Sequence, residues 1–231
     1  MKTELTYKII IPARGGSKRF PRKNIYPLNG SPLIAYSIKY ALNYFSPENI
    51  WVNTDDTEIK DIAERFGVNV FVRSDKNGSD EASTADVLKE HSEYFLRESI
   101  MFDAVILLQV TNPLRSRALM QTAIIQFENS KRQSLATYSI LNKKYGSILN
   151  NHFIPDNYSF GMRMQDIAPQ YFENGLIYIT KKESLLSGEI ITKDTFPLIV
   201  EEIGATVDID EPNDIYFAEF LLKHKEYESI Y

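Results

Sequence analysis

The sequence predicts an α/β fold in which a mainly parallel, twisted sheet is covered by helices on both faces. Short segments of strand length alternate with longer amphipathic segments along most of the chain. The strand-like segments are apolar throughout instead of alternating with polar residues, which indicates burial on both faces. With 231 residues and 43% hydrophobic content, the chain can form one large core. We therefore expect a single domain over residues 1–231, with one small protruding arm.

The N-terminal half gives the clearest alternation. Ser31 followed by Pro32 is typical of a helix start, and Gly67 is typical of the residue just past a helix end. Ser83 with Asp86 resembles a capping box at the start of another helix. We expect strands at residues 8–12, 49–54, 68–73 and 103–109, and helices at 31–44, from Asp55 and Asp56 to Gly67, and from Ser83 onward.

The pattern weakens at residues 141–170, where asparagine, lysine, proline and glycine interrupt short apolar pairs. We interpret this segment as an excursion from the sheet, used for dimerisation. Order returns with expected strands at 175–180, 198–202 and 205–210, followed by a helix from Pro212 to about Lys223.

Composition narrows the classes of function. The net charge of −5 arises from 31 acidic and 26 basic residues that are well mixed, so no general attraction to nucleic acid or to an anionic membrane is expected. There are no cysteines, which excludes disulfides, thiolate metal ligands and cysteine nucleophiles. The apolar run at residues 9–11 is too short for a signal peptide or a membrane helix, so a cytoplasmic location is expected.

A basic, glycine-containing loop follows the first expected strand, where ligands of open α/β sheets usually bind. Gly15 and Gly16 allow a tight backbone turn whose amides can face an anion. The spacing matches neither a Walker loop nor a dinucleotide fingerprint. A solvated basic turn is the alternative interpretation, but the position after a buried strand favours a polyphosphate site. The cations of this loop are Arg14, Lys18, Arg19, Arg22 and Lys23.

Two aspartates near the other end of the chain are candidate metal ligands. In an extended segment Asp208 and Asp210 share one side, whereas Val207 and Ile209 face the core. Paired carboxylates suit Mg²⁺ (or Mn²⁺), which would offset charge during phosphate chemistry. Asp210 is also positioned to cap the helix that begins at Pro212.

Several segments together resemble the acylneuraminate cytidylyltransferases, also called CMP-sialic acid synthetases. The longest match is Ile11-Pro12-Ala13-Arg14-Gly15-Gly16-Ser17-Lys18, which continues to Pro21-Arg22-Lys23-Asn24. The other matches follow in the family's order: Asn53-Thr54-Asp55-Asp56, Leu107-Leu108-Gln109, Pro113-Leu114-Arg115, Asn174-Gly175-Leu176-Ile177-Tyr178 and Val207-Asp208-Ile209-Asp210-Glu211-Pro212. The resemblance covers nearly the whole chain and implies a Rossmann-like nucleotidyltransferase fold.

The resemblance implies transfer of CMP from CTP to the anomeric hydroxyl of an acidic nine-carbon sugar, of the N-acetylneuraminate or legionaminate type, with release of pyrophosphate. It also implies a homodimer. Catalytic roles are expected for Arg14, Lys18, Asp208 and Asp210, with the two aspartates as metal ligands. CTP binding is expected for Arg14, Gly15, Gly16, Ser17, Lys18, Lys23, Asn24, Arg73 and Ser83, and sugar binding for Gln109, Arg163, Asn174 and Tyr178.

The same residues also fit other sugars and other classes of protein. The stretch Val110-Thr111-Asn112 departs from the proline, threonine and serine that the family pattern leads us to expect, so pseudaminate or Kdo is a possible sugar. The aspartate pair also fits a metal-dependent glycosyltransferase that uses nucleotide sugars, and the basic loop would fit a nucleotide-binding regulatory module. His91 lies on the apolar face of its helix, which favours a core role.

Overall fold

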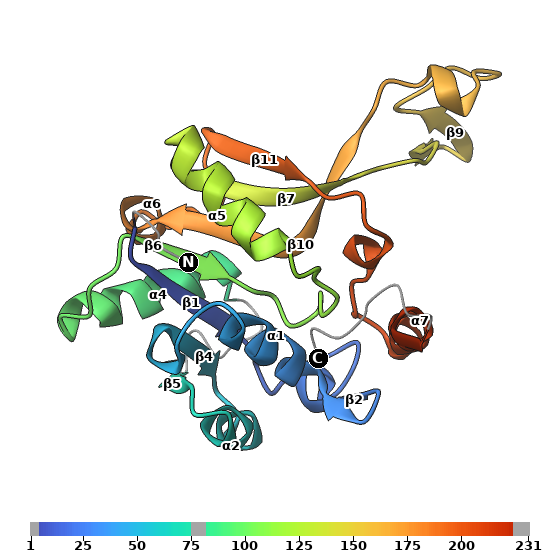
Figure 1. Ribbon diagram of the computed structural model, residues 1–231. Coiled ribbons are helices and arrows are strands. Elements are labelled where there is room, and N and C mark those ends of the chain that lie inside the picture. The colour runs from blue at the N-terminus through green and yellow to red at the C-terminus, as the bar shows by residue number, and fades with distance from the viewer. Residues whose placement is uncertain (1–4, 75–81, 224–231) are drawn as a thin grey trace.

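A sheet of seven strands runs through the computed structural model, which describes residues 5–74 and 82–223 (Figure 1). The strand order is β11-β7-β10-β6-β1-β4-β5. In chain order the strands are β1 (Tyr7–Pro12), β4 (Ile50–Thr54), β5 (Asn69–Val72), β6 (Ala104–Leu107), β7 (Ser134–Ile140), β10 (Tyr171–Lys181) and β11 (Thr195–Ile199). Two short strands, β2 (Pro27–Leu28) and β3 (Ser31–Pro32), pair outside this sheet.

The sheet is mainly parallel, as predicted. β10 runs antiparallel to both neighbours, β6 and β7, whereas the other neighbouring pairs are parallel. The carboxyl ends of β1, β4, β5 and β6 therefore meet at one edge. Residues that follow these four strands are brought together there, although they are far apart in the sequence.

Helices cover both faces of the sheet, also as predicted (Figure 1). Ile9 and Ile11 of β1 pack into a core with α1, α2 and α5, whereas Ile10 points to the other face and packs into a core with Leu88 and Phe95 of α4. The helices are α1 (Leu33–Leu42), α2 (Thr57–Arg65), α4 (Thr84–Arg97), α5 (Leu119–Ser130), α6 (Lys182–Leu186) and α7 (Pro212–Lys223). Short 3₁₀ turns are η1 (Lys23–Ile25), η2 (Pro47–Asn49), η3 (Met164–Asp166) and η4 (Ile203–Thr206).

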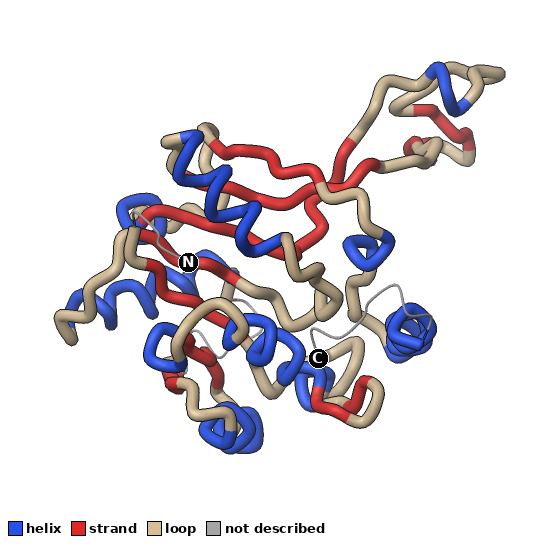
Figure 2. Tube along the Cα trace, in the orientation of Figure 1, coloured by secondary structure: helices blue, strands red, loops and turns tan. Residues whose placement is uncertain are grey.

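An arm projects from the sheet between the end of β7 and the start of β10 (Figure 2). It contains the hairpin of β8 (Gly146–Leu149) and β9 (His152–Pro155), followed by η3. The arm lies at the position of the excursion expected at residues 141–170, and its use for dimerisation stays a prediction. The arm is far from the core of the molecule, so its apolar side chains have few places to pack within one protomer.

Three predicted elements were wrong in detail. The strand expected at 198–202 is β11, which lies three residues earlier at Thr195–Ile199. Ser31 and Pro32 form strand β3, and helix α1 begins after them without a side-chain cap. Residues 205–210 are not a strand: η4 ends at Thr206 and an extended segment follows. The predicted alternation of buried and cleft-facing residues at 207–210 was correct. A single extended segment held by a loop gives the same alternation as a strand in a sheet. No helix among the described residues is long and apolar enough to cross a membrane.

Candidate active site

A cleft of about 630 Å³ opens at the edge where the four parallel strands end. Its lining comes from the loop after β1, the residue after β5, the start of α4, the residues after β6 and the aspartate segment. The predicted site residues that line it are Arg14, Ser17, Lys18, Lys23, Asn24, Arg73, Gln109, Asp208 and Asp210. Their roles remain predictions, but the fold brings the predicted phosphate-binding cations and metal ligands into one cavity.

The basic loop is held in shape by hydrogen bonds from its own residues and from the end of β4. The Asn24 Nδ2 group donates to the Arg14 carbonyl at 2.8 Å, which closes the loop on itself. The Gly15 backbone N–H donates to Asp55 Oδ1 at 2.8 Å. A Cβ atom at Gly15 would lie 2.5 Å from Asp56 Oδ2, so this position requires glycine for close approach. Gly16 is exposed and has no such neighbour.

The aspartate segment is pinned to the loop after β6. The Ile209 N–H donates to the Thr111 carbonyl at 2.8 Å, and Asn112 Nδ2 donates to the Val207 carbonyl at 3.1 Å. Val207 and Ile209 are buried, while Asp208 and Asp210 line the cleft, as predicted from their alternation. Asn112 is the departure noted in the sequence, and its amide anchors the aspartate segment.

The pKa values of the two aspartates are shifted in opposite directions. Burial raises the pKa of Asp208; a hydrogen bond from Thr111 opposes this and the neighbouring charge of Asp210 adds to it. Burial alone would also raise the pKa of Asp210, but Lys23 and Arg19 together lower it below its ordinary value. Lys23 Nζ lies 2.8 Å from Asp210 Oδ1, and Arg19 Nη2 lies 2.6 Å from Asp210 Oδ2.

The donor set fits a magnesium ion that shares its shell with a ligand. Among the described residues no group of three or more histidine, cysteine, aspartate or glutamate side chains could hold a metal by itself. Two carboxylates suit Mg²⁺, which commonly keeps waters and takes substrate phosphate oxygens. The carboxylate of Asp210 is engaged by two cations, so it is not the helix cap; Asp214 Oδ2 instead accepts the N–H groups of Asp210 and Glu211.

Of the two predicted nucleotide contacts Arg73 and Ser83, only Arg73 lines the cleft. Arg73 is 8% exposed and lines the cleft. Ser83 forms the predicted capping box with Asp86, and it is not among the residues that line the cleft, although Ala82 and Thr84 on either side of it are.

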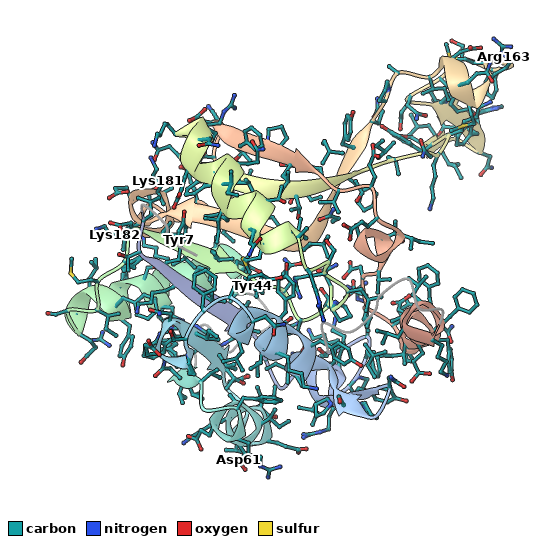
Figure 3. The ribbon with its side chains drawn as sticks, viewed as in Figure 1. Tyr7, Tyr44, Asp61, Arg163, Lys181 and Lys182 are labelled. Atoms are coloured by element: carbon teal, nitrogen blue, oxygen red, sulfur yellow. The ribbon has the colours of Figure 1, made fainter. Side chains whose placement is uncertain are left out.

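The predicted sugar contacts are not brought together within one protomer. Gln109 lines the cleft. Tyr178 is buried on β10, where its hydroxyl donates to Glu173, and burial together with the Glu173 charge raises its pKa. Asn174 is also buried and donates to Ser139 Oγ at 2.9 Å, which makes it a support for the irregular part of β10. Arg163 lies at the far end of the arm, where it pairs with Asp166 at 2.8 Å (Figure 3).

Comparison with known proteins agrees with this geometry. A model of the cytidylyltransferase family matches residues 8–229. The chain belongs to the cytidylyltransferase family. It is 35% identical to a pseudaminic acid cytidylyltransferase from Campylobacter jejuni, over 93% of this chain and 95% of that protein. It is 32% identical to a CMP-N,N'-diacetyllegionaminic acid synthase from Legionella pneumophila, over 93% of this chain and 95% of that protein.

More distant cytidylyltransferases extend the comparison. An N-acylneuraminate cytidylyltransferase from Streptococcus agalactiae is 29% identical over 96% of this chain, which corresponds to 56% of that protein. Among solved structures, a CMP:2-keto-3-deoxy-manno-octonic acid synthetase complexed with CTP superposes with a TM-score of 0.68 at 18% identity, covering 94% of this chain and 98% of that one. At that identity the likeness shows the shared fold. It confirms the Rossmann-like nucleotidyltransferase architecture.

Some residues that shape the cleft of this cytidylyltransferase were not identified as such from sequence. Arg115 is fully buried, and it donates to the Gln109 carbonyl at 2.6 Å and to the Leu176 carbonyl at 2.7 Å. It thereby ties the loop after β6 to the bulge of β10. Gly175, with φ +74°, is packed so closely that a Cβ would lie 2.4 Å from Asn112 Oδ1. A buried arginine resembles a surface arginine in sequence, and only its place in the motif Pro113-Leu114-Arg115 gave a signal.

Proposed function

We propose that this cytidylyltransferase transfers CMP from CTP to the anomeric hydroxyl of a sialic acid-like sugar and releases pyrophosphate. The observation that carries the proposal is a single cleft in which the basic loop after β1 faces Asp208 and Asp210. The relatives named for pseudaminic, legionaminic and N-acylneuraminic acids support a nonulosonic acid as acceptor. Because these relatives are named for three different sugars, they do not favour the neuraminate or legionaminate type expected from the sequence. The proposal therefore extends to nonulosonic acids as a class.

The reaction fits one direct displacement. The oxygen of the anomeric hydroxyl forms a bond to the α-phosphorus of CTP and gives up its proton to water. The bond between the α-phosphorus and the bridging oxygen breaks, and pyrophosphate leaves. Arg14 and Lys18 line the cleft and would offset the charge of the phosphates. Gln109 lines the same cleft and would orient the sugar. Most of the catalysis would come from alignment and electrostatic stabilisation.

Asp208 and Asp210 would hold Mg²⁺ or Mn²⁺. A bound divalent cation supplies charge neutralisation at the transferring phosphate. In the structure Asp210 forms ion pairs with Lys23 and Arg19. Binding of the metal and the triphosphate would replace these ion pairs, because Asp210 would then bind the metal. Lys23 and Arg19 would then turn from the carboxylate to phosphate oxygens, which are equally good partners for a cation.

The arm supports assembly as a homodimer. Large apolar side chains are exposed along it, including Ile148 at 73% and Phe160 at 74%. Such clusters on a projecting element commonly mark a protein interface. Arg163 lies at the far end of the arm, outside the cleft of its own protomer. In a dimer, Arg163 could instead reach a sugar carboxylate in the cleft of the second subunit.

The test is a turnover assay with purified protein. CTP, UTP and ATP are each combined with neuraminate, legionaminate, pseudaminate or Kdo, and pyrophosphate release is measured with and without EDTA. We expect release only with CTP, a nonulosonic acid and the divalent cation present. CTP binding without turnover on any sugar would favour a regulatory module, and transfer from a nucleotide sugar would favour a glycosyltransferase.

A further inference from the structure

A chain of buried polar groups leads from the core behind the sheet to the wall of the cleft. It starts at His91 on α4, which is fully buried against the rings of Phe71 and Phe95 at centroid distances of 4.4 and 4.5 Å. It passes through Asn53 at the end of β4 and finishes at Arg73, which lines the cleft. Hydrogen bonds thus link His91 in the core to a residue of the cleft wall.

The orientation of the Asn53 amide is fixed from the cleft side. Arg73 Nε donates to Asn53 Oδ1 at 2.7 Å, and Arg73 Nη2 donates to the Asn53 carbonyl at 2.8 Å. A guanidinium can only donate, so the amide oxygen of Asn53 must face Arg73 and its NH₂ group must face away. That NH₂ group lies 3.3 Å from His91 Nδ1.

This contact determines the state of the histidine. Because Asn53 Nδ2 is a donor, His91 Nδ1 must accept, so the ring is neutral with its proton on Nε2. Burial, together with the charge of Arg73, lowers the pKa of His91 to about 3, which agrees with a neutral ring. Nε2 has no hydrogen-bond partner among the described residues. An unsatisfied buried N–H disfavours folding, so an apolar side chain would suit this position better if its only role were packing.

We propose that His91 is a positioning residue for nucleotide binding: it fixes the Asn53 amide, which holds the Arg73 guanidinium against the wall of the cleft. The inference rests on the proposed use of CTP. Asn53 has a second link to the site, because its carbonyl accepts the N–H of Ala13 at 2.9 Å, next to Arg14 at the start of the basic loop. His91 contacts the side-chain amide of Asn53, whose oxygen accepts from Arg73 Nε, so the effect of His91 reaches the cleft through Arg73.

The experiment compares two His91 variants with a control on the same helix. His91→Leu removes the acceptor, while His91→Asn places an amide oxygen near the position of Nδ1. Ser92→Ala is the control, because Ser92 is buried and its hydroxyl has no hydrogen-bond partner among the described residues. CTP binding is measured by calorimetry, and the KM values for CTP and sugar by steady-state kinetics. Circular dichroism and thermal melting report folding; should His91→Leu fail to fold, His91→Phe keeps a ring against Phe71 and gives the same comparison.

We expect His91→Leu to weaken CTP binding about 3- to 10-fold, the equivalent of one modest hydrogen bond. His91→Asn should restore most of this loss, Ser92→Ala should match wild type, and the KM for the sugar should not move. In an Arg73→Ala background His91→Leu should add no further loss, since both act through the same guanidinium. Additive losses, or wild-type affinity in His91→Leu, would overturn the inference alone. A wild-type protein that does not bind CTP would overturn the proposed function with it.

Discussion

Lys23 and Asp210, which the sequence assigns to phosphate binding and to metal binding, are paired with each other at 2.8 Å. Arg19 adds a second cation to the same carboxylate at 2.6 Å. The cationic loop and the acidic segment of the cleft are thus in contact, and each compensates the charge of the other. Asp208 lies two residues away and forms no ion pair with the residues that the structure describes, and this difference leads to a test of the two aspartates.

Replacing each aspartate by asparagine should change stability in opposite directions. The pKa of Asp208 is raised in the folded state. At pH values above this pKa the ionised carboxylate therefore destabilises the folded protein. Asp208→Asn should therefore raise the Tm at pH 7, and the gain should disappear as the pH falls and the wild-type carboxyl is protonated. The pKa of Asp210 is lowered, so its contribution is present above the unfolded pKa and is lost as pH falls through the folded pKa. Asp210→Asn should lower the Tm at pH 7.

Differential scanning calorimetry between pH 7 and pH 3, in low salt and without metal, measures both variants. Glu201→Gln serves as a control, because Glu201 is an exposed acid in the same region of the chain. Tm shifts of the same sign for the two aspartates would contradict the electrostatic description of the cleft.

Replacing either aspartate by alanine should lower kcat. Asp208→Ala and Asp210→Ala should each lower kcat about 10²–10³-fold, the typical loss for one electrostatic contact to the transition state. Steady-state kinetics over a range of MgCl₂ concentrations measures this, with circular dichroism as a control for folding. A variant that keeps the wild-type kcat would refute the metal assignment for that residue.

Gly15→Ala should impair CTP use through the backbone of the basic loop. The added methyl would lie 2.5 Å from Asp56 Oδ2, so the loop must shift away from α2. Because a displacement of about 1 Å in a binding element can cost up to 10²-fold, we expect kcat/KM for CTP to fall about 10- to 100-fold. Gly16→Ala meets no atom within 4 Å and should have a smaller effect. Equal effects of the two changes would mean that close packing at Gly15 does not shape the loop.

Much of this site could be predicted because its signals are local. A buried strand followed by a glycine-containing cationic loop and an extended segment with alternating aspartates are both patterns of neighbouring residues. Asp56 and Ser83 were identified as helix starts for the same reason, and both cap helices in the structure. The strand expected at 205–210 failed because burial alternation does not reveal whether a partner strand exists.

What could not be predicted depends on contacts between distant residues. Asn174 was expected to face the sugar, but its amide is turned inward to Ser139, 35 positions earlier in the chain. The chain from His91 to Arg73 joins α4, β4 and the residue after β5, and only the fold brings them together. Arg163 was assigned to the sugar from the family resemblance, and its place at the end of an arm follows from three-dimensional structure alone.

The arm should hold two subunits together. Ile148→Glu and Phe160→Glu each place a charge on an exposed apolar surface of the arm, which would have to be desolvated in an interface. Light scattering after size exclusion should give twice the chain mass of 26.6 kDa for wild type and a monomer for these variants. Met101→Glu is the control, since Met101 is 79% exposed but lies outside the arm, and it should remain dimeric. A monomeric wild-type protein at micromolar concentration would rule out this role of the arm.

Arg163 should act on the sugar and not on CTP. Arg163→Ala removes a planar cation that a carboxylate accepts in two hydrogen bonds, so the KM for the sugar should rise while the KM for CTP stays nearly constant. Arg132→Ala is the control: Arg132 is also partly exposed and paired with an aspartate, Asp194 at 3.7 Å, but it lies outside both the arm and the cleft. A change confined to the KM for CTP would refute the sugar assignment.

The position of Arg163 on the arm adds a sharper test. If Arg163 serves the cleft of the partner, an Arg163→Ala subunit mixed with an Asp208→Ala subunit forms a hybrid with one intact cleft. That cleft takes its aspartates from the first chain and its arginine from the second. After co-refolding or co-expression, the hybrid should recover the wild-type KM for the sugar at up to half the wild-type kcat per dimer. If Arg163 instead acts within its own chain, the hybrid has one cleft without the arginine and one without Asp208, and the raised KM for the sugar persists.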